Sequence, residues 1–169
     1  MKPTILIIHP GALGDVLLAV PAIRSLSLRF PRHEIVLIAA APVSRLLWEC
    51  GVISDWLPLE GRACLGLFSE ASSISKELYS CVNRCDRAVV WMEDKESVLG
   101  SFFQEFGVPN VQIQSPFSKG LRATHQSDRF LETLGEPTRE SVSERTVQVP
   151  PHLLERGKDS LDALRVFQE

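Results

Sequence analysis

The chain has 169 residues, which fits one domain with its own hydrophobic core. Its formal net charge is −3, and acidic and basic residues are mixed along the sequence, so nothing indicates a nucleic-acid-binding surface. No apolar run reaches the length of a membrane-spanning helix and no leader-like cleavage site follows Met1, so we expect a soluble, cytoplasmic protein.

The first predicted element is a strand at residues 5–8, followed by a glycine turn and a helix start. The continuous apolar run is typical of a strand that is buried on both faces. Gly11 and Gly14 permit a tight turn and a close approach of the following helix. Asp15 then lies at the carboxyl end of the strand, where open α/β sheets bind ligands.

The following segments alternate between predicted helices and strands. A helix at residues 14–29 has an apolar stripe and is interrupted by Pro21. Further strands are predicted at 34–40, 52–57, 87–92 and 111–113, and further helices at 44–50, 65–84, 97–106 and 121–134. This alternation predicts a Rossmann-like α/β domain with a doubly wound parallel sheet.

The end of this domain is predicted near Gly135-Glu136-Pro137, where a turn signal precedes a polar stretch. Pro150-Pro151 then begins a last helix, which has an apolar stripe. We therefore predict a domain at 1–135, a polar linker at 136–149 and a helix at 150–169. This helix either packs back on the sheet or stays loose.

The cysteines and glycines predict neither a metal nor a cofactor. Cys50, Cys64, Cys81 and Cys85 are too scattered for a disulfide framework, so we interpret them as reduced thiols. Cys81 and Cys85 are one helical turn apart, but no second pair with zinc-ligand spacing accompanies them. The two glycines of the first turn give only Gly-x-x-Gly, and no phosphate-loop pattern occurs.

Residues 7–26, IIHPGALGDVLLAVPAIRSL, resemble the opening of the glycosyltransferase family 9 enzymes, the ADP-heptose:lipopolysaccharide heptosyltransferases. The likeness is clearest from residue 5 to residue 31. It continues more weakly in the order of the later elements and in the segment HQSDRFL at residues 125–131. The resemblance implies the amino-terminal, acceptor-binding half of a two-domain GT-B transferase, which transfers a sugar with inversion.

The resemblance assigns Asp15 as the catalytic base that takes a proton from the acceptor hydroxyl. The alternative is that this carboxylate only stabilises the start of a helix, through its interaction with the helix dipole. The family likeness favours the catalytic role.

Five further residues are candidates for substrate binding, and each has a structural alternative. His9 stands where family members often have a basic residue, although a lone histidine at a strand end is commonly structural. Gly11 and Gly14 could bring a phosphate close to backbone N–H groups, or they could only solve a steric problem. Arg122 and His125 share one face of the predicted helix with Arg129. This basic face could bind an acidic acceptor, or it could be only a solvated surface.

The implied partners are an ADP-heptose-like nucleotide-sugar donor and a lipopolysaccharide-core acceptor, with peripheral contact at the inner face of the membrane. In the family, a donor domain grips the diphosphate with a Pro-Gly-Ser turn and an Asp-Thr-Gly segment. The residues after Pro151 contain neither motif, so we expect no useful transferase activity from this chain alone.

Two other interpretations remain open. One is a stand-alone module that binds a glycan or pairs with a separate donor-domain chain. The other is an unrelated nucleotide-binding α/β domain.

Overall fold

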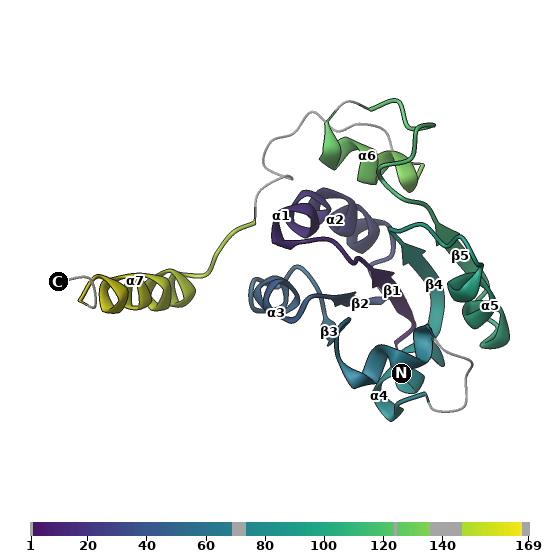
Figure 1. Ribbon diagram of the computed structural model, residues 1–169, viewed down its shortest axis with the longest axis horizontal. Helices are drawn as coiled ribbons and strands as arrows, with labels where there is room; N and C mark the ends of the chain where they lie inside the picture. Colours follow the sequence, from purple (N-terminus) through teal and green to yellow (C-terminus); the bar gives the residue numbers. More distant parts are fainter. Residues whose placement is uncertain (1, 69–73, 124, 136–146, 167–169) are drawn as a thin grey trace.

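The computed structural model describes residues 2–68, 74–123, 125–135 and 147–166. Within these residues a five-stranded parallel sheet has the order β3-β2-β1-β4-β5 (Figure 1). The strands are β1 (Thr4–Ile8), β2 (Glu34–Ala39), β3 (Asp55–Pro58), β4 (Cys85–Val90) and β5 (Asn110–Ile113). The strand order reverses between β1 and β4, which makes their carboxyl ends the topological switch point.

Helices cover both faces of the sheet, as the predicted doubly wound fold requires (Figure 1). One face is covered by α1 (Leu13–Leu18), α2 (Val20–Arg29), α3 (Ala41–Glu49) and α6 (Gln126–Thr133). The other is covered by the 3-10 helix η1 (Arg62–Leu67), α4 (Lys76–Val82) and α5 (Val98–Glu105). The predicted α/β fold class is therefore confirmed.

Strand β1 belongs to both hydrophobic cores. Ile5 and Ile7 pack into the core beneath α2, and Leu6 and Ile8 pack into the core beneath α5. Alternate side chains of a strand point to opposite faces of the sheet, so burial on both sides requires an uninterrupted apolar run. Ile8 is in register with Ile38 of β2 and Val90 of β4, so the three strands end at the same edge.

Three predicted helices differ most from the observed ones, and the helix predicted at 44–50 begins earlier, at Ala41. The helix at 14–29 is two helices that meet at Ala19, and Pro21 lies in the first turn of the second. The single helix at 65–84 is wrong: η1 ends at Leu67, and α4 begins after Ser75, whose Oγ accepts the Leu78 N–H at 3.1 Å. Residues 69–73 lie outside the described part. The helix at 121–134 begins only at Gln126.

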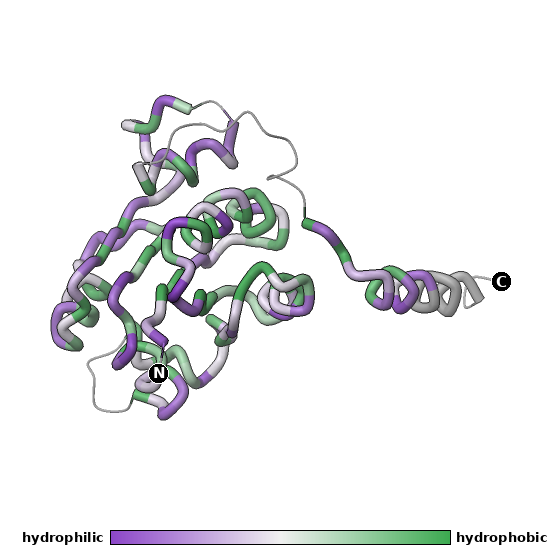
Figure 2. Tube along the Cα trace, turned by 180° about the vertical axis from the view of Figure 1, so that it is seen from behind, coloured by the Kyte–Doolittle hydropathy of each residue, from purple (hydrophilic) through white to green (hydrophobic). Residues whose placement is uncertain are grey.

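The last helix, α7 (Pro151–Val166), stands apart from the sheet in Figures 1 and 2. Arg156 forms an ion pair with Glu49 of α3 at 3.8 Å, while Leu154 is 53% exposed. The side chains of the rest of the predicted apolar stripe lie outside the described part, as do residues 136–146. The predicted boundaries of the domain, linker and terminal helix remain predictions.

The four cysteines are free thiols. Burial raises the pKa of the Cys64 and Cys85 thiols to about 11, so both stay protonated at neutral pH. Among the described residues, no three His, Cys, Asp or Glu side chains are grouped to hold a metal ion. In the same part of the chain, no helix is long and apolar enough to span a membrane.

The two-sided core predicts a large difference between two phenylalanine truncations. Phe103 of α5 is fully buried, whereas Phe117 is 61% exposed. We expect Phe103→Ala to lower the free energy of unfolding by about 3–5 kcal/mol, because it removes buried surface and leaves a cavity. The matched Phe117→Ala change should cost less than about 1 kcal/mol. Urea denaturation measures both, and equal losses would contradict this account of the core.

Candidate functional site

The glycine turn after β1 is a tightly packed unit. The N–H of Gly11 donates to Nδ1 of His9 at 3.0 Å, and the N–H of Ala12 donates to Oδ2 of Asp15 at 3.3 Å. A Cβ at position 11 would lie 2.6 Å from Cε1 of His9 and 2.8 Å from Cβ of Asp15. Only glycine therefore fits between these two side chains. A Cβ at position 14 would meet nothing within 4 Å, so sterics do not require glycine at that position.

His9 lies beneath this turn and is only 2% exposed. Its ring packs against Trp91 and Phe130, with ring centroids 5.8 and 5.2 Å away. Burial lowers the His9 pKa from 6.5 to about 4, and Nδ1 accepts a hydrogen bond, so the ring is neutral with its proton on Nε2. The predicted contact of a basic His9 with an anionic ligand therefore has no support in this geometry.

Asp15 lies in the first turn of α1 and is half-buried. Its hydrogen bond to Ala12 is long and uses one of the roughly four acceptor positions of a carboxylate. The remaining positions are available to a ligand. The Trp91 N–H, just beyond β4, donates to the Ile8 carbonyl at 2.9 Å, so β1 and β4 stay paired up to the point where the turn to Asp15 begins.

Arg122 and His125 do not form a stripe on one helical face, so that predicted arrangement is wrong. His125 is the N-cap of α6, and its Nδ1 accepts the Ser127 N–H at 3.3 Å. Arg122 precedes the helix, and its backbone N–H donates to the Glu132 carboxylate at 2.8 Å. Backbone hydrogen bonds, first from Ala123 and then from Arg122, hold the Glu132 pKa below its usual range. Both side chains remain exposed, and their predicted role in substrate binding stays a prediction.

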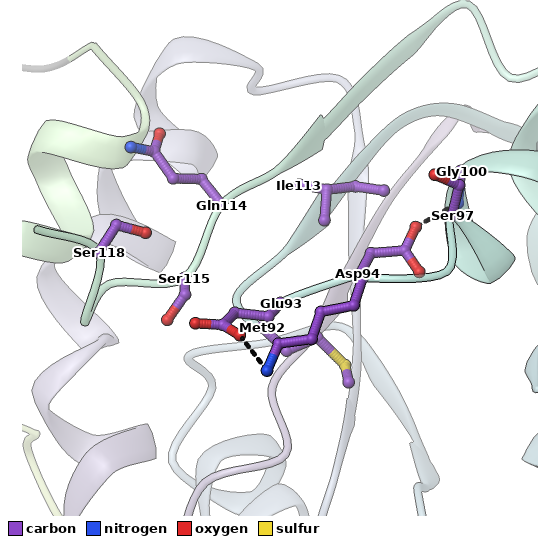
Figure 3. A pocket seen from close by; sticks show the side chains of 10 residues that line it. Met92, Glu93, Asp94, Ser97, Gly100, Ile113, Gln114, Ser115 and Ser118 are labelled. Carbon is purple, nitrogen blue, oxygen red and sulfur yellow. Dashed lines mark hydrogen bonds and ion pairs between the residues drawn. The ribbon is translucent and has the colours of Figure 1, made fainter. Parts of the chain in front are cut away.

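A pocket of about 520 Å³ lies at the carboxyl ends of β4 and β5 (Figure 3). We call it the β4–β5 pocket, and it is lined by Met92, Glu93, Asp94, Lys95, Ser97, Gly100, Ile113, Gln114, Ser115 and Ser118. This volume lies within the range of about 300–1,000 Å³ that is common for small-molecule sites. It occupies the flank of the switch point opposite the Asp15 turn.

One wall of the pocket is held by Asp94. Its Oδ1 accepts the Leu99 N–H at 3.2 Å and its Oδ2 accepts the Gly100 N–H at 2.9 Å, so this carboxylate caps α5. Ser97 has a left-handed backbone conformation with φ of 55°, which is uncommon for a residue other than glycine. The capped helix start and this turn give the wall a defined shape.

Sequence reasoning missed the polar residues of the pocket. Glu93 follows the predicted strand at 87–92, and Gln114, Ser115 and Ser118 follow the strand at 111–113. The carboxyl ends of parallel strands meet at one edge of a sheet, the edge at which Asp15 is predicted. The same rule would have placed all four residues near the candidate site.

The architecture is a Rossmann-like unit with a candidate site at its switch point, and two solved structures share this fold. No family model and no curated protein matches the chain. The family 9 glycosyltransferase of Veillonella parvula is similar over 86% of this chain and 42% of its own, at 18% identity and a TM-score of 0.56.

The ADP-heptose lipopolysaccharide heptosyltransferase II of Escherichia coli is similar over 90% of this chain and 48% of its own, at 20% identity and a TM-score of 0.56. At these identities the likeness shows the fold alone. The chain thus has the fold of about half of a GT-B glycosyltransferase, and it spans less than half the length of either protein.

The close contact at Gly11 predicts different effects at the two turn glycines. We expect Gly11→Ala to lower the free energy of unfolding by about 1–3 kcal/mol, because His9 or Asp15 must move. Gly14→Ala should be neutral or stabilise by up to about 1 kcal/mol, because alanine favours the helical conformation and has space there. Urea denaturation of both variants tests this, and equal stability would refute the tight packing.

The buried His9 predicts a loss of stability in mild acid. Its folded-state pKa of about 4 is below the unfolded value of 6.5, so the unfolded chain binds more protons between these values. The contribution is fully present above about pH 6.5 and is lost as the pH falls towards 4, by up to about 3 kcal/mol.

This loss is measured by urea denaturation at several pH values. His9→Asn should flatten the profile, since an amide oxygen can still accept the Gly11 N–H but does not titrate. The exposed His152→Asn variant should keep the wild-type profile. If His9→Asn leaves the slope unchanged, His9 does not cause it.

Proposed function

We propose that this chain is the acceptor-binding, amino-terminal half of an inverting glycosyltransferase of the heptosyltransferase type. The observation that carries the proposal is the position of Asp15, a half-buried carboxylate with open acceptor positions at the switch point of this fold. The similarity of the fold to about half of two glycosyltransferases supports it. The clear likeness of residues 5–31 to family 9 adds to that support.

In the proposed reaction, an acceptor hydroxyl attacks the anomeric carbon of the donor sugar. The new carbon–oxygen bond forms as the bond to the diphosphate oxygen breaks, and the nucleoside diphosphate leaves with the electron pair. The hydroxyl proton passes to the carboxylate of Asp15. A hydroxyl becomes strongly acidic only as it bonds to carbon, so a carboxylate within hydrogen-bond distance can accept the proton late in the step.

The partners follow from the same proposal. The donor is a nucleotide sugar of the ADP-heptose kind, and the acceptor is a sugar hydroxyl of a lipopolysaccharide core. The reaction takes place in the cytoplasm, at the inner face of the membrane. The leaving diphosphate needs positive charge or N–H donors, which a donor-binding half supplies as another segment or a separate chain.

Asp15→Asn should lower the rate of sugar transfer about 100- to 10,000-fold, because the amide cannot take the proton. Transfer is measured with the native protein together with its donor-binding half, using ADP-heptose and a lipopolysaccharide-core acceptor. Asp55→Asn is the matched control, since this exposed aspartate begins β3 at the opposite edge of the sheet. Wild-type activity of Asp15→Asn, or robust transfer by the 169-residue chain alone, would contradict the proposal.

A further inference from the structure

We propose that the β4–β5 pocket binds an uncharged, hydroxyl-rich sugar ring of the acceptor and disfavours rings that bear phosphate or carboxylate. Only the identification of this ligand as the acceptor rests on the proposed function. The basis of the proposal is the lining of an open pocket that follows β4 and β5, at the same edge of the sheet as the Asp15 turn after β1. The charges, the hydrogen-bonding groups and the apolar surfaces of this pocket each point to the same class of ligand.

The charges of the lining oppose an anion. Two carboxylates, those of Glu93 and Asp94, face one ammonium, that of Lys95, which is 3.2 Å from Glu93 and therefore already paired. The start of α5 would attract an anion if its N–H groups were free. Asp94 occupies the Leu99 and Gly100 N–H groups, so this part of the wall presents a carboxylate.

Arg129, which contacts the Ser118 end of the lining, does not change this balance. Arg129 of α6 donates from Nη2 to the carbonyl of Ser118 at 3.4 Å, and it is not among the lining residues. Phosphate and carboxylate recognition typically uses an arginine in bidentate contact with the ligand. No arginine lines this pocket, so a phosphorylated or acidic ring would lose its hydration without a matching cation.

The hydrogen-bonding groups suit hydroxyls. Glu93 can accept from two adjacent hydroxyls, and the Gln114 amide both donates and accepts. The Ser115 Oγ accepts the Phe117 N–H at 3.2 Å, which leaves its own O–H available to donate. Figure 3 shows Glu93 and Ser115 turned toward the same space, with Gln114 and Ser118 on the side of β5 and the loop after it. A sugar hydroxyl can both donate and accept a hydrogen bond, so it can pair with each of these groups.

The apolar surfaces suit the carbon skeleton of a sugar. Met92 and Ile113 line the pocket between its polar groups. A second hollow of about 580 Å³ shares residues 92–95 and is lined also by Phe68, whose ring is 47% exposed. Sugar rings carry an apolar face of C–H groups that packs on such surfaces, and the two adjoining hollows offer room for more than one ring.

The test measures binding by the whole chain without any donor. The probes are the methyl glycosides of glucose, galactose, mannose and glycero-manno-heptose, each compared with its 6- or 7-phosphate, together with glucuronate. Chemical-shift changes in NMR spectra give both the affinity and the site. We expect neutral glycosides to shift residues 92–97 and 113–118 and to bind at least about tenfold more tightly than their phosphates, a difference of about 1.4 kcal/mol.

Glu93→Gln should raise the affinity for the phosphates about tenfold, because it removes a like charge and frees Lys95. Gln114→Ala should weaken the neutral glycosides, since it removes hydrogen-bonding partners from the pocket. Glu105→Gln is the matched control for the charge change, because this exposed residue ends α5 and does not line the pocket. It should change neither affinity.

Three results would overturn the inference: no binding by any neutral glycoside, shifts that map elsewhere, or phosphates that bind as well as the neutral rings. These results are independent of the proposed function, which fails if transfer does not depend on Asp15. If neutral sugars bind selectively but no sugar is transferred, the assignment of the pocket stands and the proposed transferase function fails. If the protein transfers sugar to a charged ring and the Glu93→Gln change does not alter the rate, the transferase function stands and the assignment of the pocket fails.

Discussion

The structure depends on the complete burial of β1 between two helical layers. Every residue from Thr4 to Ile8 is fully buried, and the two cores meet only through strands such as this one. A central strand disfavours polar side chains on both faces, and after Thr4 this one is entirely apolar, so its polar neighbours His9 and Asp15 come after its carboxyl end. There the chain turns within a few residues, and the contact of Gly11 with His9 and Asp15 fixes how α1 begins.

Two aspartates near the switch point differ in how their charge is used. Both oxygens of Asp94 accept backbone N–H groups of α5, so this carboxylate is a structural cap. Asp15 makes one long hydrogen bond to Ala12 and keeps acceptor positions for a ligand. Asp94 therefore holds the start of α5 in place, whereas Asp15 keeps acceptor positions that a ligand hydroxyl can use. This difference, more than the position of either residue, separates the candidate base from its neighbour.

The positions of the main strands could be predicted because their causes are local, whereas their order in the sheet was not predicted. Buried apolar runs identified β1, β2 and β4, and the helix predicted at 44–50 ends where Gly51, with φ of 67°, follows α3. The start of α6 could not be predicted, because Glu132 binds the N–H groups of Arg122 and Ala123 from about ten residues away and holds them outside the helix. The capping of α5 by Asp94 could not be predicted either, because it depends on the left-handed turn at Ser97.

The candidate site shows the same division between local and distant causes. The turn from His9 to Asp15 is one continuous segment, so its residues could be found together in the sequence. The burial of His9 depends on Trp91 and Phe130, which come from β4's end and from α6, and these contacts make its ring neutral. A basic residue at this position was a fair expectation for an exposed strand end. For a ring buried against Trp91 and Phe130, desolvation outweighs the attraction of Asp15 and lowers the pKa of His9, while its predicted role in substrate binding stays a prediction. The neutral His9 thus adds no positive charge to this edge of the sheet, where the carboxylates of Asp15, Glu93 and Asp94 outnumber the ammonium of Lys95.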